Sequence, residues 1–110
     1  MFNPWARTIV VTGPAKSLLS YMAVLDPAWN NTPRAVSCVQ LQLDINAGGI
    51  HLYVGNAGVS TTDRGFELIA DQAGPNSMPI FGNAISLESI WLVSSSIQES
   101  VQVNVTVIQA

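Results

Sequence analysis

The sequence predicts an all-β domain, either an antiparallel β-sandwich or a jelly-roll-like barrel of about seven or eight short strands. Three observations lead to this class. Apolar and polar residues alternate over strand lengths, turn residues recur about every ten positions, and no segment gives a convincing helical pattern. The 110 residues are the size of one domain, which is large enough to bury a core without crosslinks.

Two alternating segments give the clearest strands. Residues 39–45 alternate Val, Leu, Leu and Ile with Gln, Gln and Asp, and residues 101–107 alternate four valines with Gln, Asn and Thr. This period of two gives a strand one buried face and one wetted face. We expect the Gln and Thr faces of these strands either at the solvent or against a neighbouring copy that hydrogen-bonds to them.

The other elements have weaker signals. Residues 50–54 alternate again after the turn composition of residues 46–49, which predicts a hairpin with residues 39–45. Residues 16–25 fit both a helical stripe and a strand, and we favour a strand because their neighbours are β. Further strands are predicted at 7–12, 65–70 and 87–93, with irregular pairing at 80–86. Loops are predicted where Pro, Gly, Asn and polar residues gather, at 26–34, 59–65 and 71–79.

The start of the chain has a different composition. Phe2, Pro4 and Trp5 follow neither a strand nor a helix pattern, so residues 1–6 are predicted to form an apolar arm and residues 7–110 the sandwich domain. No charged leader is followed by an apolar run, and no stretch of about 18 apolar residues occurs. We therefore expect neither a secretory signal nor a membrane span, and a protein made in the cytoplasm.

The low charge of the chain favours assembly. Charged residues make up 10% of the sequence, against a usual value of about 25%, and the net charge is −3. The four basic residues are scattered, so we expect no nucleic acid partner. Few charges give weak repulsion between copies, which suits a protein in a permanent assembly. The single cysteine, Cys38, cannot form an internal disulfide and is expected to behave as a small apolar residue.

Groups for catalysis are scarce. His51, the only histidine, would form a triad with Ser60 as nucleophile and Asp44 as orienting carboxylate, but no Gly-x-Ser-x-Gly elbow supports it. A strand histidine on a polar face is the simpler interpretation. One Cys and one His cannot supply the ligands that zinc prefers, and the Asp63, Glu67 and Asp71 spacing does not place three carboxylates on one face. We therefore predict no catalytic, cofactor-binding or metal-binding residue, and no cofactor.

Aromatic residues and the arm supply the predicted interface. In the loop 26–34, a tryptophan that folds back as a lid on the core is favoured over one that faces a partner. Packing in the core or between subunits explains the aromatic side chains, and stacking on sugars is the alternative. The predicted interface residues are Phe2, Pro4, Trp5, Trp29, Tyr53 and Trp91.

Short motifs between residues 36 and 107 have a recognisable order. They include Tyr53-Val54-Gly55, Gly58-Val59-Ser60, Gly65-Phe66-Glu67-Leu68 and Ile90-Trp91-Leu92. This order resembles small virion proteins of tailed bacteriophages, in which a Tyr-Val-Gly segment, a Val-Ser loop, a Gly-x-x-Leu turn and an Ile-x-Leu strand recur. The resemblance covers about two thirds of the chain. It implies a β-sandwich present in multiple copies on a phage particle, with no catalytic residue.

The function expected from the sequence is that of a non-enzymatic virion structural protein. The resemblance implies a capsid decoration (cement) protein that binds the capsid shell and stabilises it through contacts between copies. Its expected partners are other copies of itself, with a trimer preferred, and the major capsid protein. A head-tail junction or tail component is the first alternative, and a carbohydrate-binding β-sandwich module is the second.

Overall fold

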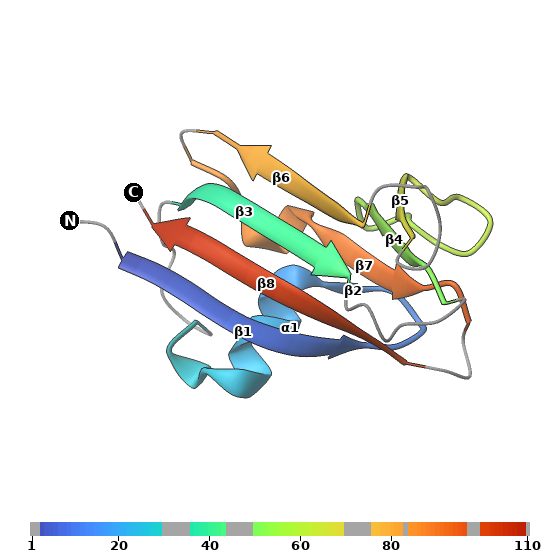
Figure 1. Cartoon of the computed structure of the whole chain (residues 1–110), viewed down its shortest axis with the longest axis horizontal. Coiled ribbons are helices and arrows are strands. Elements are labelled where there is room, and N and C mark those ends of the chain that lie inside the picture. Colours follow the sequence, from blue (N-terminus) through green and yellow to red (C-terminus); the bar gives the residue numbers. More distant parts are fainter. Residues whose placement is uncertain are drawn as a thin grey trace.

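The computed structural model describes residues 3–29, 36–43, 50–69, 76–82, 84–96 and 100–109. Two antiparallel sheets of four strands each pack face to face (Figure 1). The prediction of an all-β sandwich is therefore confirmed.

Each sheet contains strands from distant parts of the chain. The first sheet, sheet A, contains in spatial order β1 (Asn3–Val11), β8 (Val101–Gln109), β3 (Val36–Leu43) and β6 (Ser77–Phe81). The second, sheet B, contains β2 (Lys16–Ser17), β7 (Trp91–Ser94), β4 (Leu52–Gly55) and β5 (Phe66–Leu68). The other described elements are the helix α1 (Leu18–Leu25) and two 3-10 turns, η1 (Pro27–Trp29) and η3 (Leu87–Ser89).

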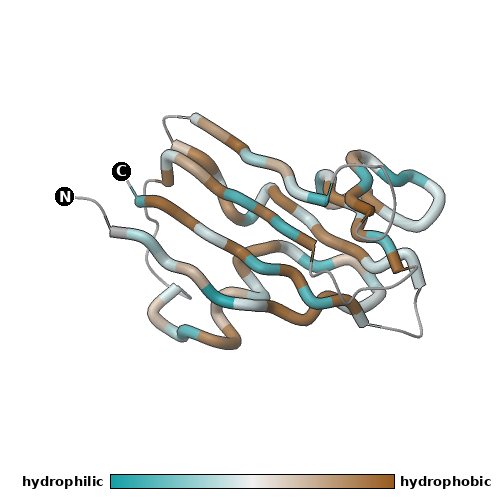
Figure 2. Tube along the Cα trace, viewed as in Figure 1, coloured by the Kyte–Doolittle hydropathy of each residue, from teal (hydrophilic) through white to brown (hydrophobic). Residues whose placement is uncertain are grey.

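Strand β8 lies at the centre of sheet A. It pairs with β1 over nine residues on one side, and with β3 on the other side. Its four valines are buried, whereas Gln102 between them is exposed. Figure 2 shows this alternation as brown segments between teal or pale ones along β8. The strand predicted at 101–107 is confirmed.

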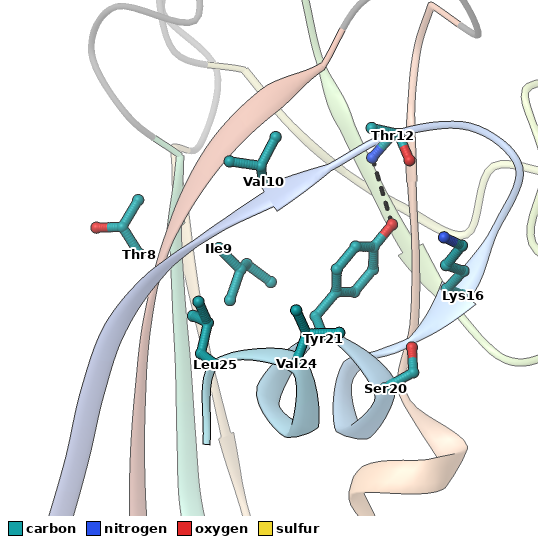
Figure 3. A pocket seen from close by; sticks show the side chains of 9 residues that line it. All are labelled: Thr8, Ile9, Val10, Thr12, Lys16, Ser20, Tyr21, Val24 and Leu25. Atoms are coloured by element: carbon teal, nitrogen blue, oxygen red, sulfur yellow. Dashed lines mark hydrogen bonds between the residues drawn. The ribbon is translucent and has the colours of Figure 1, made fainter. Parts of the chain in front are cut away.

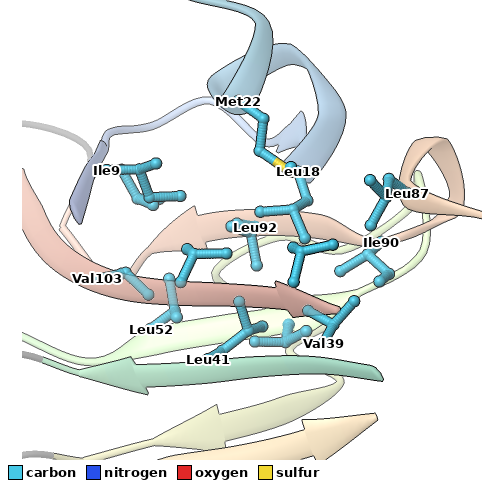
Figure 4. Close-up of a cluster of buried hydrophobic side chains, with 14 of the residues drawn as sticks. Ile9, Leu18, Met22, Val39, Leu41, Leu52, Leu87, Ile90, Leu92 and Val103 are labelled. Atoms are coloured by element: carbon cyan, nitrogen blue, oxygen red, sulfur yellow. The ribbon is translucent and has the colours of Figure 1, made fainter. Parts of the chain in front are cut away.

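The core between the sheets is mainly aliphatic (Figure 4). Val39 and Leu41 of sheet A share one cluster with Leu52 and Leu92 of sheet B, and all four side chains are fully buried. Full burial of such a side chain contributes about 1.5–3 kcal/mol relative to exposure. The alternation along β3 therefore places its valine and leucine side chains against the second sheet.

A helix, not a strand, occupies residues 18–25, so the strand favoured there is wrong. The Ser17 Oγ caps this helix by accepting a hydrogen bond from the Ser20 N–H at 3.2 Å. Leu18 and Met22, one turn apart, are fully buried in the main core. The helix packs beside β1 and beside β2, a strand of only two residues. Burial of its apolar face outweighed the β character of the neighbouring sequence.

Replacing the cap residue should weaken the helix measurably. Ser17→Ala is expected to lower the free energy of unfolding by about 1 kcal/mol, because the Ser20 N–H loses its acceptor. Urea unfolding followed by circular dichroism measures this change. Ser17→Asp should restore most of the stability, and Ser89→Ala, at an exposed serine in η3, should change it by less than about 0.5 kcal/mol. A Ser17→Ala protein as stable as the parent would contradict the role of the cap.

The hairpin predicted between residues 39–45 and 50–54 does not form. Strand β3 pairs with β8 and β6 in sheet A, whereas β4 pairs with β5 and β7 in sheet B. Consecutive Leu52, Tyr53 and Val54 are all buried, so β4 needs apolar cover on both of its faces. If β4 lay beside β3, only one of its faces would be buried, because the exposed Gln40 and Gln42 show that the other face of sheet A is open to solvent. The turn residues 46–49 lie outside the described residues.

The arm predicted at residues 1–6 is wrong for residues 3–6, which begin strand β1. Pro4 and Trp5 lie opposite Ile108 and Val107 of β8. The Trp5 ring also makes an edge-on contact with Trp29, with centroids 6.2 Å apart and planes at 75°. Pairing with β8 and this ring contact explain why the segment is a strand. Residues 1 and 2 lie outside the described residues.

The remaining predicted strands are found with shifted bounds. Strand β5 falls within the segment predicted at 65–70. Strand β7 starts at Trp91, because residues 87–89 form the 3-10 turn η3 in place of the first part of the predicted strand 87–93. The irregular pairing expected at 80–86 is found. Strand β6 pairs with β3 up to Phe81, and beyond it the Gly82 and Ile85 N–H groups donate to the Ser37 and Val36 carbonyls at 3.2 and 2.9 Å.

Candidate interaction surface

Part of the outer face of sheet B is covered by the chain itself. Tyr53 and Val93 lie opposite each other in β4 and β7 and form a second buried cluster with Val59. Val59 belongs to the loop 56–65, and Trp91 and Ala15 pack at the border of this cluster. The Arg64 guanidinium lies 5.4 Å from the centre of the Tyr53 ring. This part of sheet B therefore has a cover made of the loop.

Two glycines allow the loop to come this close to the sheet. A Cβ atom on Gly55 would lie 3.1 Å from the Val59 side chain. Gly65 has a φ of 61°, in the left-handed region, and a Cβ there would lie 2.4 Å from the Val54 carbonyl oxygen. The sequence motif Gly65-Phe66-Glu67-Leu68 thus starts at a position whose backbone conformation and close contact only glycine can accommodate.

Substitution of Gly65 should destabilise the protein. Gly65→Ala is expected to cost about 1–3 kcal/mol, because alanine disfavours the left-handed region and its methyl group would clash with the Val54 carbonyl. Thermal unfolding measures the loss. Gly58→Ala is the matched control, since a Cβ there would meet only the exposed Asn56 side chain, and we expect a change below about 1 kcal/mol. Equal effects of the two substitutions would contradict this account.

The outer face of sheet A, in contrast, is not covered by any described element (Figure 1). We call it the open face. It consists of the side chains that alternate with the buried ones along the four strands. Its members are Pro4, Ala6, Thr8, Val10, Cys38, Gln40, Gln42, Ser77, Pro79, Phe81, Gln102, Asn104, Thr106 and Ile108.

The strand register orders the open face into rows of different polarity. One row across the four strands is apolar and consists of Pro4, Ile108, Cys38 and Phe81. Two rows further along the strands, a polar row consists of Thr8, Asn104, Gln42 and Ser77. In that row the Thr8 hydroxyl donates to the Asn104 side-chain oxygen at 2.7 Å. Phe81, at the edge of the apolar row, is 74% exposed.

No acidic residue, lysine, arginine or histidine is a member of the open face. The charged side chains of the described residues lie elsewhere, at Arg7, Lys16, Asp26, Asp63, Arg64, Glu67 and Glu88. Amide and hydroxyl groups cost much less to remove from water than charges, and they form hydrogen bonds with a partner. The open face therefore combines low desolvation cost with many donors and acceptors.

The open face is large enough to hold a partner. Four strands of nine, nine, eight and five residues, spaced about 4.8 Å apart with about 3.3 Å per residue, give an area of roughly 500 Å². A standard interface buries about 800 Å² on each partner. Side-chain relief adds to the flat area, so one partner on this face would approach the size of a stable interface.

The predicted interface residues are not gathered on the open face. Trp29 and Tyr53 are 2% and 4% exposed, so both side chains belong to the chain's own core clusters and not to its surface. The lid prediction for Trp29 is therefore confirmed. Trp5 and Trp91 are half-buried, and the Trp91 indole N–H donates to the Glu88 carbonyl at 2.9 Å. Only Pro4 is a member of the open face. Phe2 lies outside the described residues.

The histidine lies in a different setting from the triad considered above. The His51 Nδ1 contacts a Glu67 carboxylate oxygen at 2.5 Å, and both side chains are partly exposed. The Ser60 Oγ accepts hydrogen bonds from the Thr62 and Asp63 N–H groups within its own loop. Asp44 lies outside the described residues. The His51–Glu67 pair joins the segment before β4 to β5 and serves as a local contact.

Two further features bear on possible metal or membrane binding. Within the described ranges, no group of three or more His, Cys, Asp or Glu side chains is placed to hold a metal ion. Among the helices of those ranges, none is long and apolar enough to cross a membrane.

The chain matches no protein-family model, and no curated protein is similar to it at a significant level.

Sequence reasoning found part of the open face. The Gln and Thr faces of residues 39–45 and 101–107 were expected at the solvent or against a neighbouring copy, and Gln40 and Gln42 are indeed exposed. The direct pairing of these two strands in one sheet was missed, as were Phe81 and Cys38. The available signal is the absence of charge from the polar positions of the two best strands, apart from Asp44.

Proposed function

We propose that this protein is a structural component of a virus particle, of the kind that decorates the capsid of tailed bacteriophages. In this role it binds the major capsid protein and other copies of itself, and it stabilises the shell by burying surface rather than by chemistry. A trimer is the preferred assembly, as the resemblance to phage decoration proteins implies.

The observation that carries this proposal is the difference between the two outer faces. The loop 56–65 covers Tyr53 and Val93 on the outer side of sheet B, whereas the described residues leave the outer face of sheet A uncovered and without a charged side chain. An uncharged surface of amide, hydroxyl and apolar groups suits contact between identical copies, since no like charges meet there. The resemblance of residues 36–107 to small phage virion proteins supports the same role.

The carbohydrate-binding alternative loses one of its two predicted platforms. A ring that stacks on a sugar must present a face to solvent, and Trp29 is buried in the core. Trp91 is half-buried at the border of the loop cluster, with its indole N–H already bonded to a backbone carbonyl. No specific observation now favours a sugar ligand.

Analysis of purified virions tests the proposed function. Particles from a host that carries the gene are separated on a stained gel, and the band of this protein is compared with that of the major capsid protein. A decoration protein should be present at a copy number comparable with the capsid protein. A copy number equal to a single symmetric ring would assign it to the head-tail junction, and its absence from the particles would contradict the proposal.

A further inference from the structure

Strand β1 forms a long edge of sheet A. Among the described strands it pairs only with β8, so its other side lacks a neighbouring strand. It has nine residues, whereas the opposite edge strand, β6, has five. A long edge offers backbone N–H and C=O groups to any extended segment that lies beside it.

The ends of the usable edge are defined by two residues. In antiparallel pairs, alternate residues direct their backbone groups away from the partner strand. Pro4 has no N–H to offer, and the Thr12 N–H is already bonded to the Tyr21 hydroxyl of α1 at 3.3 Å. Both positions are even-numbered. Every second residue of a strand directs its N–H and C=O groups to the same side. Ala6, Thr8 and Val10 therefore direct theirs to the same side as Thr12, which is the free edge of β1.

A groove of about 490 Å³ runs along this edge, between β1 and α1 (Figure 3). Figure 3 shows Tyr21, Val24 and Leu25 projecting from the helix toward the strand. Val24 is 81% exposed and Val10 is 49% exposed. The helix thus provides an apolar floor beneath the position that an added strand would take.

The charge of the groove limits what it binds. Of its lining residues only Lys16 is charged, and the Lys16 ammonium lies 6.0 Å from the centre of the Tyr21 ring. An acidic side chain at this end of the groove would find a cation and no competing carboxylate. A second copy of β1 would not supply one, because its only charged residue is Arg7.

We propose that this groove binds an extended segment of a partner protein, which joins sheet A as a fifth strand beside β1. Backbone hydrogen bonds to Ala6, Thr8 and Val10 hold the segment, alternate aliphatic side chains rest on Val24 and Leu25, and an acidic residue faces Lys16. The inference concerns the backbone edge of β1, although the side chains of Ala6, Thr8 and Val10 belong to the open face, and it does not depend on the virion role.

A peptide titration tests the proposal. The probe is a blocked heptapeptide that alternates Val and Thr after an initial Glu, added to the isotopically labelled full chain and followed by amide NMR shifts. We expect saturable shifts at Ala6, Thr8, Val10 and along α1. The same peptide with Lys in place of Glu should bind up to about fivefold more weakly, as is typical of a surface charge pair.

Variants separate the groove from other surfaces. Val24→Glu adds a charge to the floor of the groove without touching the core and should weaken binding of the acidic peptide about tenfold. Ala57→Glu, which adds the same charge in the exposed turn of loop 56–65, should leave the affinity unchanged. Both variants should keep the dispersed amide spectrum of the parent protein.

Three results would overturn the proposal. The first is the absence of saturable shifts at millimolar peptide. The second is a set of shifts confined to Gln40 and Gln42 of the open face. The third is equal binding of the peptide to the Val24→Glu and Ala57→Glu proteins.

Discussion

Gln40→Glu is expected, under the proposed function, to weaken the binding of this protein to other copies and to the capsid shell by about 100-fold or more. The substitution hardly changes the size of a side chain in the middle of the open face, but it adds a carboxylate that assembly would bury without a partner. Burial of an unpaired charge costs several kcal/mol, and each 1.4 kcal/mol is a factor of ten in affinity. The measurement is binding to shells stripped of the protein, together with sedimentation of the free protein.

A matched control distinguishes the face from the added charge. Asn56→Asp adds the same charge in the exposed turn of loop 56–65 and keeps the acceptor for the Gly58 N–H. Its binding should be unchanged, and both variants should retain their free energy of unfolding to within about 0.5 kcal/mol. Equal binding by the Gln40→Glu and Asn56→Asp proteins would show that the open face does not mediate assembly.

Leu41→Ala is expected to give the largest loss of stability, about 2–5 kcal/mol. Leu41 is the next residue along β3, but its side chain points to the opposite face and is fully buried between the sheets. Its truncation removes the transfer free energy of the lost methyl groups and leaves a cavity. Chemical unfolding of the free protein measures the change.

Gln40→Ala is the control for that substitution. It truncates the neighbouring exposed side chain of the same strand, so the free energy of unfolding should change by less than about 0.5 kcal/mol. The two residues thus separate folding from assembly, since Leu41 should affect stability and Gln40 binding. A stable Leu41→Ala protein would contradict the two-layer core.

The sequence predicted the sandwich because its best strands each have one wet face. Residues 39–45 and 101–107 alternate cleanly, and burial alternates in the same way in β3 and β8. The fold class follows from this local pattern. The pairing partners of a strand do not, because they depend on surfaces far away in the sequence.

The errors come from segments whose apolar residues are contiguous. Residues 50–54 were predicted to form a strand with one exposed face. Leu52, Tyr53 and Val54 are nevertheless all buried, because loop 56–65 covers the face that was expected to contact solvent. The helix at 18–25 was missed because its residues fit both a helical stripe and a strand, and the β character of the neighbouring segments was given more weight. The Ser17 cap and the Pro27 that follows the helix were the available signals.

The open face was only partly predictable for the same reason. Alternation shows that Gln40 and Gln42 share a face, but only the register of β8 beside β3 places Asn104 and Thr106 next to them. The aromatic residues misled the search for an interface, since a tryptophan or tyrosine is equally suited to a core. In this protein the side chains of Trp29 and Tyr53 are buried in the core clusters.

The single cysteine provides the most direct test of the open face. Cys38 lies in its apolar row between Ile108 and Phe81 and is partly exposed in the free chain. The rate of its reaction with a small thiol reagent is compared between the free protein and purified virions that carry it. As a control, a protein with Cys38→Ser and Ala57→Cys carries its thiol on the loop over sheet B. We predict that assembly slows the reaction of Cys38 more than tenfold and leaves the control unchanged; equal rates for Cys38 in the free and assembled protein would contradict the account.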